Sequence, residues 1–152
     1  MLVLGALGWG AAAYLSRDDR PADLAVVDPR ATDRVRTDVA RILTQVLSYD
    51  YSDPQAMTTA AEQLLTGEAR REHRELFEAV RQKAGDQQLV LSAQVQAAAV
   101  TRLDGDRASL LVFLDQSSRR ADDKEASVSA AQLSVKAVRV GGAWKISGLE
   151  PL

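Results

Sequence analysis

The sequence has no cysteine, a single histidine and few aromatic side chains, which make up 5% of its 152 residues. The absence of cysteine excludes disulfides, thiolate catalysis and any zinc site built on cysteine. With one histidine, a transition-metal site would have to consist of carboxylates alone, a poor ligand set for such ions. We therefore expect no metal and no cofactor, and a fold that is stabilised by packing.

A strong charge of one sign is also absent, because 19 Lys and Arg balance 21 Asp and Glu. No broad positive field is available to attract nucleic acid, so we expect no nucleic-acid partner. The acidic cluster of Asp122, Asp123 and Glu125 lacks the glycine and the spacing of a calcium loop. The Gly141-Gly142 pair precedes a strand pattern rather than a helix, which indicates a hairpin turn and not a phosphate-binding loop.

The first 15 residues (MLVLGALGWGAAAYL) carry no charge. A full membrane span needs about 20 apolar residues, whereas the core of a signal peptide needs about 7 to 15. We interpret residues 1–15 as a membrane anchor, shorter than usual, followed by a charged linker over residues 16–28. A cleaved signal peptide with the small residues Ala11 to Ala13 at its cleavage site, and a buried helix of the core, are the alternatives.

Residues 29–152 contain helical patterns first and strand patterns second. Asp28-Pro29 and Asp53-Pro54 each combine a capping residue with a proline suited to a first helical turn. The spacing predicts helices over residues 29–47, 54–66 and 68–84, the last with Leu76, Phe77 and Val80 buried. Period-two alternation then predicts strands over residues 89–103, 108–116, 127–140 and 143–149.

Two details of the strand patterns carry further predictions. Alternation in the first strand places one set of residues on the buried face: Leu89, Leu91, Ala93, Val95, Ala97 and Ala99. The run over residues 110–114 (LLVFL) is apolar at every position, which predicts a strand covered on both faces. Together the patterns predict an α+β domain, with three helices packed on a curved antiparallel sheet of about four strands.

Several segments make the sequence resemble the Mce-associated membrane proteins of actinobacteria, which are small anchored accessories of the Mce lipid-import systems. They are the apolar start, Leu47-Ser48-Tyr49-Asp50-Tyr51, Leu65-Thr66-Gly67, residues 110–116 (LLVFLDQ) and residues 142–149 (GAWKISGL) followed by Glu150-Pro151. The resemblance implies a cone-shaped domain like that of nuclear transport factor 2 (SnoaL-like), on the extracytoplasmic side of the cell membrane. It further implies a role in assembling or stabilising an Mce transporter, with transporter subunits and the membrane as partners.

Four residues are candidates for chemistry in such a cone, because some cone-shaped domains pair a carboxylate base with a tyrosine. Tyr49, Asp50 and Tyr51 follow the first helix, where we expect them to close the helix and cover the core, since sequence neighbours on a helix diverge. Asp115 lies in a strand, where it could project into a cavity or mark the end of burial.

The remaining singular residues have structural interpretations. His73 lies among Arg70, Arg71, Glu72, Arg74 and Glu75, which predicts a histidine on a charged helix surface. Trp144 alternates with polar positions in the last strand, which predicts a core aromatic rather than a ligand-stacking one.

We therefore interpret the protein as a non-catalytic anchored accessory that holds protein partners. Three alternatives stay open: a lipid- or steroid-binding carrier, a small enzyme that uses Asp50 or Asp115 with a tyrosine, and a scaffold subunit of a type IV secretion apparatus.

Overall fold

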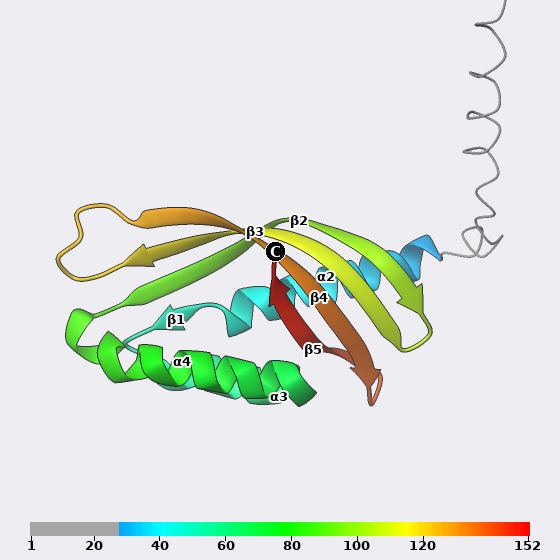
Figure 1. Cartoon of the computed structure of the whole chain (residues 1–152), viewed down its shortest axis with the longest axis horizontal. Helices are drawn as coiled ribbons and strands as arrows, with labels where there is room; N and C mark the ends of the chain where they lie inside the picture. Colours follow the sequence, from blue (N-terminus) through cyan, green and yellow to red (C-terminus); the bar gives the residue numbers. More distant parts are fainter. Residues whose placement is uncertain (1–27) are drawn as a thin grey trace, which may run out of the picture.

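The computed structural model describes residues 28–152, in which three helices lie beneath an arched five-stranded antiparallel sheet (Figure 1). The helices are α2 (Pro29–Val46), α3 (Pro54–Leu64) and α4 (Gly67–Gln87). The strands are β1 (Tyr49–Asp50), β2 (Val90–Asp104), β3 (Arg107–Arg119), β4 (Ser127–Val140) and β5 (Ala143–Pro151), and they lie in the sheet in chain order. The predicted α+β class is confirmed, and β1 is a strand that the sequence patterns missed.

The predicted anchor (residues 1–15) and the linker up to residue 27 lie outside the described residues. Within residues 28–152, no helix combines the length and the apolar character that a membrane crossing requires.

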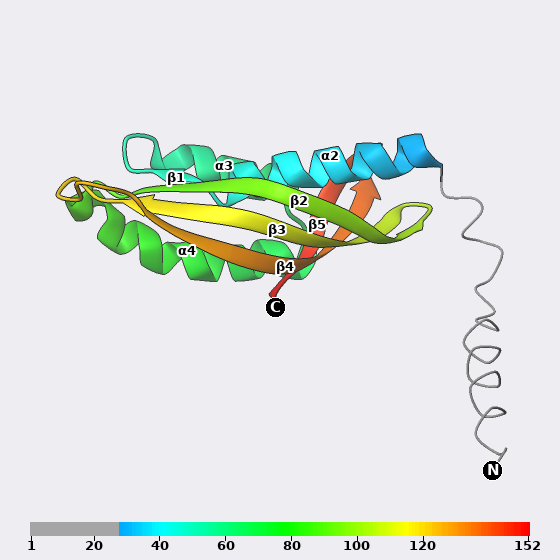
Figure 2. The same cartoon turned by 90° about the horizontal axis from the view of Figure 1, so that it is seen from above.

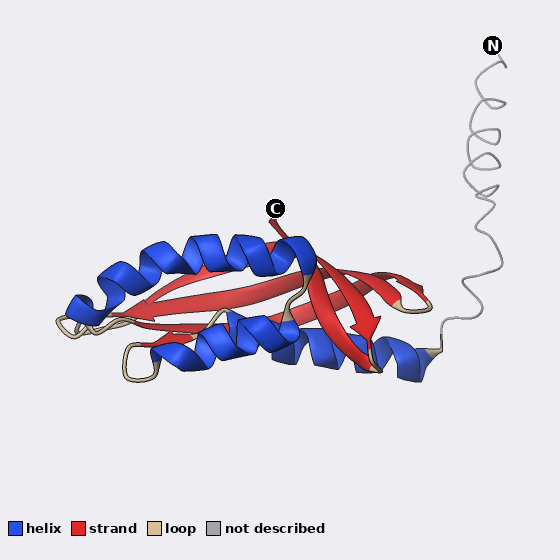
Figure 3. Cartoon of the chain, turned by 90° about the horizontal axis from the view of Figure 1, so that it is seen from below, coloured by secondary structure: helices blue, strands red, loops and turns tan. Residues whose placement is uncertain are grey.

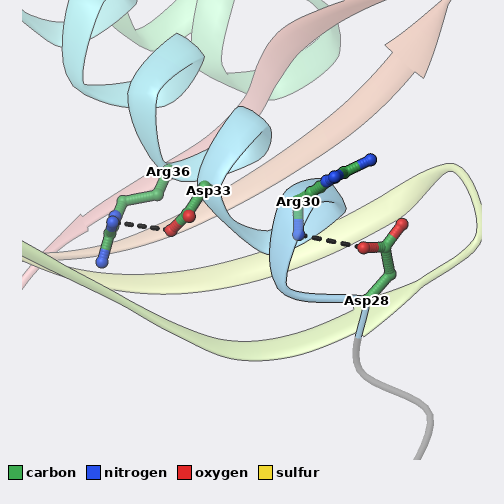
Figure 4. A network of polar contacts seen from close by, with 4 residues as sticks. All are labelled: Asp28, Arg30, Asp33 and Arg36. Carbon is green, nitrogen blue, oxygen red and sulfur yellow. Dashed lines mark hydrogen bonds and ion pairs between the residues drawn. The ribbon is translucent and has the colours of Figure 1, made fainter.

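Helix α2 begins where the sequence predicts. The Asp28 carboxylate accepts a hydrogen bond from the Arg30 backbone N–H at 2.9 Å, and Arg36 pairs with Asp33 at 2.7 Å on the exposed side (Figure 4). The cap satisfies one of the backbone donors that every helix start leaves free. The opposite side of the helix is buried against the sheet, through Val35, Val39, Ile42, Leu43 and Val46.

Helices α3 and α4 depart from the predictions in their details. The side chain of Asp53 makes no capping bond, so Pro54 alone marks the start of α3. At the other end of α3, the Arg70 guanidinium donates to the carbonyls of Glu62 and Leu65 and satisfies two acceptors that the helix leaves free. The buried positions of α4 are Ala69, His73, Phe77 and Ala84, whereas Leu76 is 64% exposed, so its predicted burial was wrong.

The register of β2 against β3 shifts twice, between Val95 and Ala97 and between Val100 and Arg102. A residue inserted into one strand reverses the facing of every residue after it. The predicted burial of Ala97 and Ala99 was therefore wrong, and Ala98 and Val100 pack against the core in their place.

The core lies between the helices and the inner face of the sheet, which Figure 3 shows from the helix side. Leu110, Val112 and Leu114 of β3 are almost fully buried there. In the view from above, no helix of residues 28–152 passes over the outer face of β2, β3 and β4 (Figure 2). Phe113 on that face is 43% exposed, so the prediction of a strand covered on both sides was wrong for the residues that the structure describes.

Candidate functional site

A groove of about 610 Å³ opens to solvent where the end of α2 meets α3 and the start of β2. Tyr49 is its buried aromatic residue, and it packs with Met57, Phe77, Ala84 and Leu89 in a second, smaller core cluster. The groove is lined by Gln45, Ser48, Tyr49, Asp50, Asp53, Ala56, Met57, Ala60, Val90, Leu91 and Ser92. Tyr49 and Asp50 form a short strand that pairs with Leu91 and Val90, and they do not close the helix as predicted.

Asp50 is exposed at the rim of this groove, and its carboxylate closes a tight turn. One carboxylate oxygen accepts hydrogen bonds from the Ser52 hydroxyl at 2.7 Å and from the Ser52 backbone N–H at 2.8 Å. These two bonds hold the pKa of Asp50 below its ordinary value, the hydroxyl having the larger effect. A general base works best with a pKa near the operating pH, so this environment moves Asp50 away from that role.

Asp115 lies apart from the groove, half-buried on the outer face of β3. Its neighbours across the strands are Gln94 of β2 and Ala130 of β4. Asp50 pairs with Val90 of β2, and Val90 pairs with Arg119 of β3, which lies four residues after Asp115. Four residues correspond to about 13 Å along a strand. The two candidate carboxylates consequently do not converge on one substrate, and Tyr51 is an exposed residue of the turn after β1.

His73 is buried, so the prediction of a histidine on a charged surface was wrong. It is 7% exposed, its ring stacks on Phe77 with centroids 4.4 Å apart, and its Nε2 lies 2.5 Å from the backbone carbonyl oxygen of Val46. That carbonyl belongs to the last residue of α2, where helix acceptors have no partner within the helix. Burial lowers the pKa of His73, against a smaller opposing effect of the bond to Val46, which favours a neutral ring that donates from Nε2.

The sequence contained the signal for this histidine. Ala69, His73 and Phe77 are spaced by four residues, which places them on one side of a helix, and the charged neighbours of His73 occupy the other positions. The cavity beside His73 measures about 40 Å³, a volume suited to water and far below that of a lipid or a steroid.

The space beneath the sheet is occupied by protein side chains. Ile42, Leu43, Leu65, Leu110 and Ile146 are all fully buried in the main cluster. Trp144, which is 8% exposed, belongs to the same cluster, as predicted, with the Arg139 guanidinium 5.3 Å from its ring centre. Residues 28–152 also contain no group of three acidic or histidine side chains placed to hold a metal ion.

Comparisons with known sequences cover only part of the chain. No family model matches the chain. An uncharacterized protein of Mycobacterium tuberculosis, Rv1362c, is 36% identical over 69 residues, which are 45% of this chain and 31% of that protein. The chain thus matches less than a third of the length of this relative.

Among solved structures, a nuclear transport factor 2-like protein from Salmonella enterica aligns with a TM-score of 0.56 and 15% identity, over 80% of this chain and 92% of that one. An IcmL-like type IV secretion system protein from Legionella pneumophila aligns with a TM-score of 0.63 and 7% identity, over 79% and 91%. A periplasmic fragment of TraM aligns with a TM-score of 0.58 and 9% identity, over 78% and 95%. Residues 28–152 therefore have the fold of nuclear transport factor 2-like domains.

Proposed function

We propose that this chain is a non-catalytic, membrane-anchored accessory protein whose domain lies outside the cytoplasm and assembles or stabilises an Mce-type lipid-import complex through protein contacts. The observation that carries the proposal is the filled inner face of the sheet. In other proteins a cone of this kind can enclose a ligand pocket, but here Ile42, Leu110 and Ile146 occupy that space.

The arrangement of the candidate residues favours a binding role over an enzymatic one. Asp50 is exposed with a lowered pKa, and Asp115 lies on the outer face, so the described residues bring no acid, base and substrate cavity together. The same filled core argues against a lipid or steroid carrier, because the larger hollows that remain are open and have charged residues in their lining. Asp50 and Asp53 line the groove described above, and Arg102, Asp104 and Arg107 line a hollow of about 790 Å³ at the turn between β2 and β3.

Two further observations support the location and the kind of complex. The uncharged run over residues 1–15 has the character of an anchor, and the fold is shared with the periplasmic fragment of TraM. The sequence segments that resemble Mce-associated proteins favour the lipid-import complex in particular. A scaffold subunit of a type IV secretion apparatus is the second candidate, because the IcmL-like secretion protein has the same fold.

Affinity purification of the full chain from its native membrane, after mild crosslinking, tests the proposal. We expect mass spectrometry to identify Mce subunits in amounts comparable to the chain itself. Recovery of secretion-system subunits would favour the second candidate instead. Recovery of the chain alone would contradict both, and a stoichiometric lipid on the isolated chain would support the carrier.

A further inference from the structure

The first half of β4 forms an open edge of the sheet. On one side, β3 pairs with β4 along its length, from Arg107 opposite Val138 to Ser118 opposite Ser127. On the other side, β5 pairs with β4 only as far as Pro151 opposite Leu133. Among the residues that the structure describes, no strand adjoins the outer side of residues 127–131, which we call the β4 edge.

The backbone groups that face outward at this edge can be assigned. The Leu152 N–H donates to the Gln132 carbonyl at 2.9 Å, so Gln132 directs its carbonyl toward the β5 side. Alternate residues of a strand direct their backbone groups to the same side. Val128 and Ala130 therefore direct both N–H and C=O outward, where they can accept the backbone of an additional strand.

The opposite edge of the sheet differs in regularity and in charge. Strand β2 pairs with β1 only at Val90 and Leu91, and beyond that point it contains two register shifts and the charged residues Arg102 and Asp104. Bulges and charges are devices that prevent an exposed edge from pairing with another chain. The β4 edge has no such protection, because its pairing with β3 continues without a shift and residues 127–132 (SVSAAQ) contain neither charge nor proline.

The side chains at the β4 edge define the chemistry of a partner. Val128 is 66% exposed, and the remaining side chains are small or uncharged, so the edge suits an extended segment with uncharged side chains and one apolar residue near Val128. Five residues of strand provide about 17 Å of edge, which accommodates a short segment rather than a folded domain face.

A second copy of this chain conflicts with Leu152 in the register that pairs Val128 of one copy with Ala130 of the other. Antiparallel pairing of two copies about Ser129 would let Val128 of each copy exchange hydrogen bonds with Ala130 of the other. The same register would place Ala126 of the second copy opposite Gln132, a position that Leu152 already occupies. A heterologous segment in line with β5 can stop before Leu152 and avoids this conflict.

A contact this short is weak between freely diffusing molecules, because stable interfaces bury roughly 1,200 Å² or more. Confinement in one membrane complex raises the effective concentration of the two partners and compensates for a small contact. The inference therefore rests on the proposed function.

We propose that the β4 edge binds an extended, uncharged segment of a subunit of the membrane complex, which adds to the sheet as a further strand in line with β5. The bonds to this segment are made by the outward N–H and C=O groups of Val128 and Ala130.

Hydrogen exchange of individual amides tests the proposal, in the complex purified from native membranes and in the full chain alone at high dilution. We expect the amides of Val128 and Ala130 to exchange at least about tenfold more slowly in the complex. The amides of Ser129 and Ala131 face β3 and should exchange at the same rate in both samples.

A pair of variants at one position provides a second readout. Ala130→Pro removes the outward N–H without removing a bond to β3, and an edge strand tolerates proline at such a position. We expect this variant to fold normally and to lose the subunits that co-purify with the wild type. Ala130→Ser keeps the outward N–H, so this variant should retain the co-purifying subunits.

Four results would overturn the proposal. If the amides of Val128 and Ala130 exchange at the same rate in a complex that contains the subunits as in the chain alone, the edge makes no contact with a subunit, and the proposed function still stands. Protection in the dilute chain alone would mean that the chain covers its own edge, and protection that rises with the concentration of the pure chain would identify a second copy as the occupant. If no subunit co-purifies with the wild type, the proposed function fails and this proposal fails with it.

Discussion

Leu110 and Leu111 are neighbours on β3, but they face opposite sides of the sheet and have different surroundings. Leu110 is 2% exposed in the main core cluster. Leu111 is only half-buried, and it lies between Ala99 of β2 and Ser134 of β4 on the outer face. The inner face therefore contributes most of the stability, and within residues 28–152 no helix or strand covers the outer face or the β4 edge.

Truncation of the inner leucine should have the largest effect. Leu110→Ala removes buried methyl groups and leaves a cavity that the surrounding helices and strands fill only in part. We expect the free energy of unfolding to fall by about 2–5 kcal/mol, as measured by urea denaturation followed by circular dichroism. A loss below about 1 kcal/mol would show that the inner face is not the main source of stability.

His73 should have the next largest effect, because it links α4 to the end of α2. His73→Ala removes the bond to the Val46 carbonyl and the stacking on Phe77, and we expect a loss of about 2 kcal/mol. His73→Gln, which can still donate to that carbonyl, is the matched control and should lose less. Equal losses in the two variants would argue against a role for the hydrogen bond.

His73 also predicts a pH dependence of stability. Its pKa in the folded protein is lower than the ordinary value of 6.5, so the unfolded chain binds the proton more readily. The neutral His73 ring contributes fully to the free energy of unfolding above pH 6.5. This contribution is lost as the pH falls from 6.5 through the lower pKa that His73 has in the folded protein. Urea denaturation at a series of pH values should show this loss, and His73→Gln should abolish it.

Truncation of the outer leucine should cost less than either inner change. We expect Leu111→Ala to lower the free energy of unfolding by less than about 1.5 kcal/mol, because the side chain is already partly in water. The same denaturation assay applies. A loss equal to that of Leu110→Ala would mean that the outer face is packed as tightly as the inner one.

Asp50→Asn should have the smallest effect. The residue is exposed, and the asparagine oxygen can still accept the bonds from Ser52, so thermal unfolding and the co-purification of partners should match the wild type. If this variant folds normally but has lost an activity that the wild type shows, the result would support an enzyme rather than an accessory protein.

The periodic patterns predicted most of the fold because they follow directly from which face is buried. The start of α2 at Asp28-Pro29 and the hairpin at Gly141-Gly142 depend on local chemistry, and both were predicted. The bulge of β2 between Val95 and Ala97 was not, because the sequence VQAAAV over residues 95–100 alternates acceptably in either register. The burial of His73 was missed although its four-residue spacing from Ala69 and Phe77 marks the buried side of α4, because the charged neighbours in sequence were given more weight.

The candidate site could be predicted in composition but not in arrangement. Tyr49 was expected to cover the core, and it does, although it lies on a strand. The separation of Asp50 from Asp115 depends on strand order, and the open β4 edge depends on where β5 ends against β4. Neither can be deduced from the spacing of residues in one strand.

Native mass spectrometry of the full chain purified from its own membrane distinguishes an accessory protein from a lipid carrier. We expect a stoichiometric complex of the chain with at least one protein subunit and without a stoichiometric lipid. A chain that is recovered alone, or with one bound lipid and no protein, would contradict the accessory role.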